Sequence, residues 1–197
     1  TSSEYAIAID PNDPEALITK ANSLLNIENY EESAKFYQRY LDIYPDDELA
    51  LTNLAKALIH LDRNEEAVEK LENAISVAPE DSPVLGEIYQ ELALTYSENG
   101  DLKRAIDCVD KTKDIDCDHA VIEVLKGHIY LSAGLRKDAQ KHFQKAIEES
   151  DSVKQTILHV IVSFYDNKYT EIAHKLFVNY FEDADESLKD GYAYMAL

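Results

Sequence analysis

The side chains best suited to metal or redox chemistry in this 197-residue sequence are two cysteines and six histidines. Cys117, His119 and His128 follow a C-x-H-x8-H pattern, and thiolate and imidazole are common zinc ligands. His119 is expected to begin a helix, and His128 then lies more than two turns farther along it, so the three would not meet at one ion. Cys108 and Cys117 also fit neither a CxxC pair nor a zinc knuckle. We therefore expect no metal site.

Other catalytic signatures are also missing from the sequence. It contains no evident nucleophile–base pair, no glycine-rich phosphate loop and no paired catalytic carboxylates. The many acidic residues follow solvated helix faces and helix starts, where the helix macrodipole favours negative charge. We expect a protein that is not an enzyme and that needs no cofactor.

The charge balance restricts the kind of partner. The chain has 19 basic and 39 acidic residues, a net charge of −20. Such a surface repels phosphate, so we expect neither nucleic-acid nor membrane binding and favour a protein or peptide of basic or mixed charge. A simpler interpretation is that the acidic residues keep an elongated protein soluble. The two unpatterned cysteines and the absence of a secretion signal favour a cytoplasmic location, although a signal could have been removed.

One short phrase recurs along the chain at an even interval. AIAIDPND fills residues 6–13, YLDIYPDD fills 40–47 and AISVAPED fills 74–81, which spaces Pro11, Pro45 and Pro79 34 residues apart. Between these phrases the apolar residues follow helical spacing, and each interval holds two amphipathic helices of roughly 12–15 residues. The proline ends the second helix, because it lacks the N–H donor and its ring clashes with the preceding turn. The sequence therefore predicts helical hairpins in series.

The turns between the helices carry suitable residues. Gly100 and Gly134 stand where a helix would end in a left-handed residue. Asp13–Pro14 and Ser82–Pro83 each place a capping oxygen before a proline at the first helical position.

These residues resemble the tetratricopeptide repeats, a family of 34-residue helix–turn–helix units. Positions within the 34-residue unit are here called slots. The family has small residues at slots 8, 20 and 27 and bulky residues at slots 4, 11 and 24. Counted from Pro14, slot 8 holds Ala21, Ala55, Ala93 and Gly127, slot 11 holds Leu24, Leu58, Tyr96, Tyr130 and Phe164, slot 20 holds Ser33, Ala67, Ala105, Ala139 and Ala173, and slot 27 holds Ala6, Tyr40, Ala74, Thr112 and Ala146. Small residues let neighbouring helices approach closely, so we expect enlarging Ala105 or Ala139 to cost roughly 1–3 kcal/mol.

The resemblance implies an all-α fold, a right-handed αα-superhelix (solenoid) of about five stacked units with partial helices at both ends. The predicted array fills residues 1–197: a second helix at 1–13, units at 14–47, 48–81, 82–119, 120–153 and 154–186, and a first helix at 187–197. The third unit has four extra residues, because Ala67 and Ala105 are 38 residues apart. Four residues add about one helical turn, so we expect the helix near Ser82 to begin one turn early. The apolar ends, including Tyr192, Tyr194, Met195 and Leu197, favour a longer array or association of copies into a homo-oligomer.

In the family that the chain resembles, the first helix of each unit lines a concave binding face. The residues expected to face that groove are mostly polar, with amides suited to gripping a peptide backbone: Asn22, Asn26, Thr52, Asn53, Lys56, His60, Gln90, Leu94, Ser97, Val124, His128 and Leu131. The leading hypothesis is a scaffold that binds a peptide or helical segment of a partner. The alternative is a regulatory or assembly segment of a larger multidomain protein, acting through its ends or convex face.

One family subtype is disfavoured. Some members clamp the carboxylate tail of chaperones with two asparagines and three cations. Asn22 and Asn53 match the asparagines, but the cationic slots hold Ile18, Glu87 and Glu91. Because two glutamates would repel an acidic tail, we expect no clamp of this kind.

Overall fold

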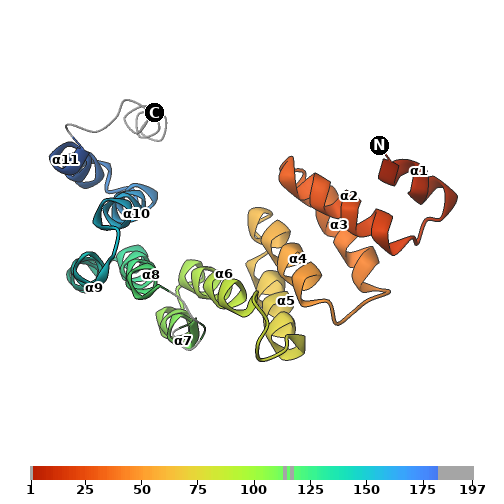
Figure 1. The fold of residues 1–197 in the computed structure, drawn as a ribbon, viewed down its shortest axis with the longest axis horizontal. Coiled ribbons are helices and arrows are strands. Elements are labelled where there is room, and N and C mark those ends of the chain that lie inside the picture. The colour runs from red at the N-terminus through yellow and green to blue at the C-terminus, as the bar shows by residue number, and fades with distance from the viewer. Residues whose placement is uncertain (1, 113–114, 116–117, 182–197) are drawn as a thin grey trace. The chain divides into compact units, whose positions relative to one another are not determined.

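The computed structural model describes residues 2–112, 115 and 118–181 of the chain. Within these residues the secondary structure is α-helical, with no strands. The helices are α1 (Ser2–Ile9), α2 (Pro14–Asn26), α3 (Tyr30–Leu41), α4 (Glu48–His60), α5 (Asn64–Val77), α6 (Leu85–Glu98), α7 (Leu102–Thr112), α8 (His119–Ser132), α9 (Arg136–Glu149), α10 (Val153–Asp166) and α11 (Thr170–Phe181) (Figure 1). The predicted all-α fold of consecutive hairpins is confirmed.

The chain divides into two compact parts, residues 1–99 and 100–197. In the first part, α2 packs on α3 and α4 packs on α5, while α3 and α5 also contact the helices that follow them, α4 and α6. In the second part, α8 packs on α9 and α10 on α11, and α10 also contacts both α8 and α9. Each hairpin therefore covers an apolar flank of its neighbour within its own part. The unit boundaries assigned from the sequence stay predictions, and the helix expected at 187–197 lies outside the described residues.

The small-residue slots are buried, as the sequence predicts. Ala21, Ala55 and Ala93 at slot 8 have no exposed surface, and the same holds for all five residues at slot 20, which are Ser33, Ala67, Ala105, Ala139 and Ala173. Ser33 is polar, but its hydroxyl donates a 3.0 Å hydrogen bond to the carbonyl of Ala21 on the paired helix. The helices of a hairpin thus meet at points where no larger side chain fits.

The hairpin turns share one backbone geometry. A single residue with positive φ follows the first helix of each hairpin: Glu28, Asp62, Gly100, Gly134 and Lys168, with φ between 57° and 76°. In the turn after α2, the Asn29 amide donates to the carbonyl of Leu24 at 2.9 Å, five residues back, as in a Schellman motif. Gly100 and Gly134 confirm the sequence prediction, whereas the three non-glycine residues were not predicted.

The helix starts give a mixed result. Asp13 caps α2 as predicted, because its carboxylate accepts from the Ala16 amide at 3.1 Å and Pro14 is the first helical residue. The prediction for Ser82 is wrong. The helix α6 begins at Leu85 and is preceded by a turn, so the four extra residues form no additional helical turn. The Ser82 amide donates to the carbonyl of Pro79 at 3.0 Å, and buried Ser82 thereby belongs to the connection between hairpins.

The helix α1 packs on α2, as expected for the second helix of a preceding unit. Its side chains Tyr5 and Ile9 are 77% and 87% exposed. The apolar residues expected near the other terminus, from Tyr192 to Leu197, lie outside the described residues.

Gly127 gives a direct test of the packing constraint. A methyl group added at this buried glycine would fall within 3.0 Å of three ring atoms of Phe143 on α9. Alanine is the better helix former by about 1 kcal/mol, so helix propensity alone would make Gly127→Ala stabilising. We expect the opposite, a loss of about 1–3 kcal/mol in the free energy of unfolding, because the helices α8 and α9 must separate.

Urea denaturation measures this difference. Adding Phe143→Leu to Gly127→Ala removes the ring that clashes, so the double variant should show a favourable coupling between the two changes. Gln144→Ala, at an exposed site on α9, serves as a control. A Gly127→Ala chain as stable as the unsubstituted chain would contradict this account of the small slots.

Candidate functional site

The first helices of the hairpins in residues 1–99 form a continuous face. α4 contacts both α2 and α6, so side chains from these three helices lie next to one another. Asn22 and Asn26 on α2 are exposed, and Asn53 on α4 and Gln90 on α6 are half-buried. These four amides are the most regular feature of the face, which we call the amide face, and each offers both a donor and an acceptor.

Tyr37 orients two of these amides. Its ring is fully buried between the helices, while its hydroxyl donates to Oδ1 of Asn22 and is also hydrogen-bonded to Asn53. Burial raises the pKa of Tyr37 to about 12, and the bond to Asn53 only partly opposes this rise. The hydroxyl therefore stays protonated at neutral pH and holds amides from α2 and α4 in fixed positions. A fixed side chain loses less entropy when it binds a partner.

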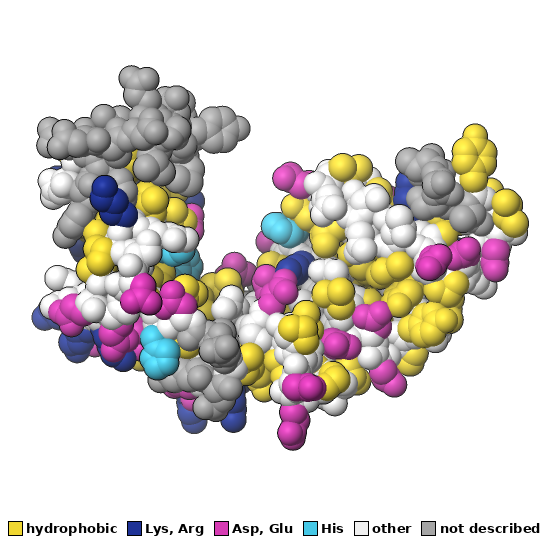
Figure 2. Space-filling model, in the orientation of Figure 1, with side chains coloured by type: hydrophobic (Ala, Val, Ile, Leu, Met, Phe, Trp, Pro, Cys, Tyr) yellow, Lys and Arg dark blue, Asp and Glu magenta, His cyan; other side chains and the backbone are white. Residues whose placement is uncertain are grey.

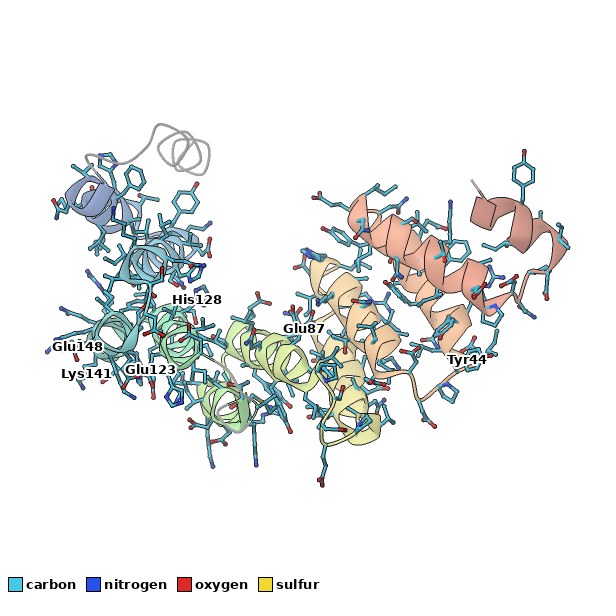
Figure 3. The ribbon with its side chains drawn as sticks, in the orientation of Figure 1. Tyr44, Glu87, Glu123, His128, Lys141 and Glu148 are labelled. Atoms are coloured by element: carbon cyan, nitrogen blue, oxygen red, sulfur yellow. The ribbon has the colours of Figure 1, made fainter. Side chains whose placement is uncertain are left out.

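Lys56 connects α4 to α6 on the same face. Its ammonium group pairs with Glu87 and lies 3.9 Å from a carboxylate oxygen of Glu91. Burial raises the pKa of the Glu91 carboxyl, and the charge of Lys56 opposes this effect. Glu87 (Figure 3) and Lys56 both remain partly exposed, so the cluster offers charge of both signs to a partner.

His60 closes the C-terminal end of α4 with an aromatic stack. Its ring lies parallel to that of Tyr30, with ring centroids 4.1 Å apart and planes 11° apart. His60 is exposed and Tyr30 is half-buried, and the stack therefore places a flat apolar surface beside the amide face. Leu94 and Ser97 on α6 are half-buried.

Three residues predicted for the binding face are not accessible to a partner. Thr52 has no exposed surface, and its hydroxyl donates to the carbonyl of Glu48 at 2.6 Å. Val124 and Leu131 on α8 are 8% and 1% exposed and belong to the apolar core beneath α9 and α10. The sequence assignment went wrong here because it treated every position near the groove slots as inward-facing, whereas adjacent helical positions turn by about 100°. His128, on the same helix, is half-buried.

The second part contains charged residues that the sequence analysis missed. Glu123 on α8, labelled in Figure 3, is 4% exposed. Its two carboxylate oxygens lie 2.7 Å from His142 Nδ1 and 2.9 Å from Lys145 Nζ, both on α9. The His142 ring also stacks on Tyr130, with centroids 5.0 Å apart. Lys126, 7% exposed, pairs with Asp110 on α7 at 2.6 Å. These ion pairs link neighbouring helices. The sequence signal that could have revealed them is the position of Glu123 and Lys126 within the apolar stripe of α8.

The described residues contain no group of three or more His, Cys, Asp or Glu side chains placed to hold a metal ion. Cys117, whose C-x-H-x8-H spacing was considered and rejected as a metal site, lies outside the described residues. No helix in the described part of the chain has the length and apolar character needed to cross a membrane.

Comparisons with known proteins identify the class. Three family models, each described as a tetratricopeptide repeat, match residues 4–48, 46–118 and 124–152. The chain belongs to the tetratricopeptide repeat family, as its small-residue slots and hairpins predict. No curated protein matches the chain by sequence.

Solved structures with the same fold are more distant in sequence. A crystal structure of MamA is 24% identical, covers 75% of this chain and 78% of its own, and has a TM-score of 0.66. YrrB, described as a TPR protein with an unusual peptide-binding site, is 16% identical over 98% of both chains with a TM-score of 0.62. PilW, described as a type IV pilus biogenesis factor, is 15% identical, covers 97% of this chain and 88% of its own, and has a TM-score of 0.70. These likenesses concern the fold.

The Glu123 cluster predicts a pH dependence of stability. Burial disfavours the ionised carboxyl, but the hydrogen bonds and charges of His142 and Lys145 outweigh it and lower the pKa of Glu123 below its ordinary value of 4.5. The ionised cluster therefore stabilises the fold above pH 4.5, and this contribution disappears as pH falls through the lowered pKa. The free-energy gap between the chain and Glu123→Gln should shrink over that range.

Urea unfolding of both proteins between pH 3 and pH 7 measures this difference in the free energy of unfolding. Glu148→Gln makes the same chemical change at an exposed site on α9 and should alter stability by less than about 0.5 kcal/mol. A gap for Glu123→Gln that stays constant down to pH 3 would show that the carboxylate does not couple to folding.

Proposed function

We propose that the chain is a protein-interaction scaffold whose amide face binds an extended peptide segment of a partner protein. The observation that carries this proposal is the row of accessible amides on α2, α4 and α6, two of them fixed by the Tyr37 hydroxyl. An extended backbone presents N–H and C=O groups in alternation, and asparagine and glutamine side chains match both. Stacked repeats provide such continuous binding surfaces generally.

The charges beside the amides favour a peptide of mixed charge. Glu87 and Glu91 would attract a cationic side chain, and Lys56 would attract a carboxylate if its present ion pairs exchanged. YrrB, which shares the fold, is described as having an unusual peptide-binding site, and this description supports peptide binding as a use of the scaffold. Because fold alone does not choose a ligand, the proposal depends on the amide face of this chain.

The test uses peptides selected for binding to the whole chain from a displayed 12-residue library. Affinity of the selected peptide is then measured by calorimetry for the variant Asn22→Ala/Lys56→Ala/Gln90→Ala. Each lost hydrogen bond contributes about 0.5–1.5 kcal/mol, so the triple variant should bind at least tenfold more weakly. The affinity of His128→Ala, in the second part of the chain, is measured separately to test whether α8 contributes to binding.

The matched control changes the same residue types on second helices, as Gln38→Ala/Asn73→Ala/Lys70→Ala. Gln38 and Asn73 are exposed on α3 and α5, away from the amide face, and this variant should bind normally. Circular dichroism confirms that both variants remain folded. Equal affinity of the two triple variants would refute the amide face as the binding surface.

A further inference from the structure

The second part of the chain has an apolar cavity between α9, α10 and α11, with a volume of about 830 Å³. Its floor is formed by Phe143, Val160 and Phe164, and Ile172 and Leu176 of α11 form one wall. The remaining lining residues come from α9: Arg136, Lys137, Gln140, Gln144, Ile147 and Glu148. Sites for small ligands and side-chain anchors in proteins occupy roughly 300–1,000 Å³, so this cavity, here called the α9–α11 groove, is large enough to hold several side chains.

The repeat itself provides an internal comparison. In residues 1–99, the matching space between α3, α4 and α5 has a volume of only about 210 Å³ and is lined mainly by charged and polar side chains around Leu54 and Leu58. The two sites can be aligned by their buried slot-20 residues. Ser33 on α3 corresponds to Ala139 on α9, and Ala67 on α5 corresponds to Ala173 on α11. At the slots where α5 carries Glu66 and Lys70, α11 carries Ile172 and Leu176.

This substitution changes what the groove can contact. The charged side chains of Glu66 and Lys70 are well hydrated, and Glu66 forms an ion pair with Arg63 at 2.7 Å. Ile172 and Leu176 are only half-buried, so their apolar surface faces the open groove. Exposed apolar surface of this kind, rimmed by polar residues, is typical of a protein-interaction site.

The charges at the two ends of the groove differ. Arg136 and Lys137 are exposed at the start of α9 and form no ion pair with other described residues, and the Arg136 guanidinium lies 5.0 Å from the centre of the Tyr169 ring. An adjoining depression is lined by Arg136 and Lys168 together with one acidic residue, Glu171. Glu148 stands at the other end, where its carboxylate accepts from Gln144 Nε2 at 2.9 Å. In a chain of net charge −20, a cationic end is a selective feature.

The length of the groove indicates the shape of the occupant. From Arg136 to Glu148 the wall follows about three turns of α9, or roughly 18 Å at 1.5 Å per residue. A partner helix of similar length presents apolar side chains one turn apart, and helices dock into apolar grooves in this way. A helix satisfies its own backbone N–H and C=O groups, whereas an extended strand would place unpaired backbone groups against the apolar floor of Phe143, Val160 and Phe164.

We propose that the α9–α11 groove is a second docking site, which binds a short amphipathic helix of a partner protein, with the acidic end of that helix next to Arg136 and Lys137. This site is formed by second helices and by α10, and it is separate from the amide face in residues 1–99. The apolar face of the partner helix covers Ile172 and Leu176, and its carboxylates pair with Arg136 and Lys137.

The first experiment measures fluorescence anisotropy of a labelled 14-residue synthetic helix with leucines one turn apart and three glutamates at one end. The full chain should bind this peptide, and a peptide with lysines in place of the glutamates should bind at least tenfold more weakly. The variant Arg136→Glu/Lys137→Glu should bind the acidic peptide at least tenfold more weakly than the unsubstituted chain does. Ile172→Glu/Leu176→Lys installs the residues of α5, leaves the net charge unchanged and should abolish binding.

Lys103→Glu/Arg104→Glu is the matched control, because it makes the same charge change at exposed positions on α7. Its affinity for the acidic peptide should stay within twofold of that of the unsubstituted chain. An equal loss in this control, or equal binding of the acidic and basic peptides, would overturn the proposal. Loss of binding in the triple variant of the amide face would also overturn it, since the two sites would then not be separate.

A second experiment identifies the occupant without any substitution of the apolar wall. A photo-reactive amino acid replaces exposed Gln140 in the full chain, and the cross-linked product is mapped by mass spectrometry. Cross-linking to the acidic peptide supports the proposal. Cross-linking to residues 182–197 of the same chain, or to a second copy, would show that the chain covers its own groove and would overturn it, as would the absence of any product.

Discussion

The close approach of paired helices is the constraint on which the structure depends. Where the paired helices meet, slot 20 holds alanine or serine with no exposed surface, and slot 8 holds Ala21, Ala55, Ala93 and Gly127 but the larger Ile161 on α10. A methyl group at Gly127 would already overlap the Phe143 ring, so the tolerance is smaller than one carbon atom. Bulky side chains such as Tyr37 and Phe143 then fill the space on either side of each contact.

Charge has a different role in the interior than on the surface. Figure 2 shows acidic side chains spread over the visible face of both parts, in keeping with the net charge of −20. Three buried or half-buried charges link one helix to another: Glu123 joins α8 to α9, Lys126 joins α8 to α7, and Lys56 joins α4 to α6. Replacing such pairs with well-packed apolar residues is often neutral, whereas removing one partner leaves a buried charge without compensation and is destabilising.

The fold could be predicted from the sequence because its signals repeat. The proline interval, the small slots and the glycine turns each recur, so an error at one repeat is corrected by the others. The turn at Ser82 could not be predicted, because a four-residue insertion fits either a longer helix or a longer connection, and burial of Ser82 together with its bond to Pro79 favours the connection. The binding face remains a prediction, and burial removes Thr52 and Leu131 from it, because these residues differ from accessible neighbours by a rotation that slot counting does not resolve.

The left-handed residue in each hairpin turn has a consequence for how the repeats tolerate change. Glu28, Asp62 and Lys168 adopt a backbone conformation that glycine reaches without steric cost. Gly100 and Gly134 occupy the corresponding positions in the other two hairpin turns. Helix packing therefore dictates the path of the chain, and the turn residue conforms to it. Since Glu28, Asp62 and Lys168 are all exposed, the turns of this chain carry charged side chains in some hairpins and glycine in others, above helices that pack in the same way.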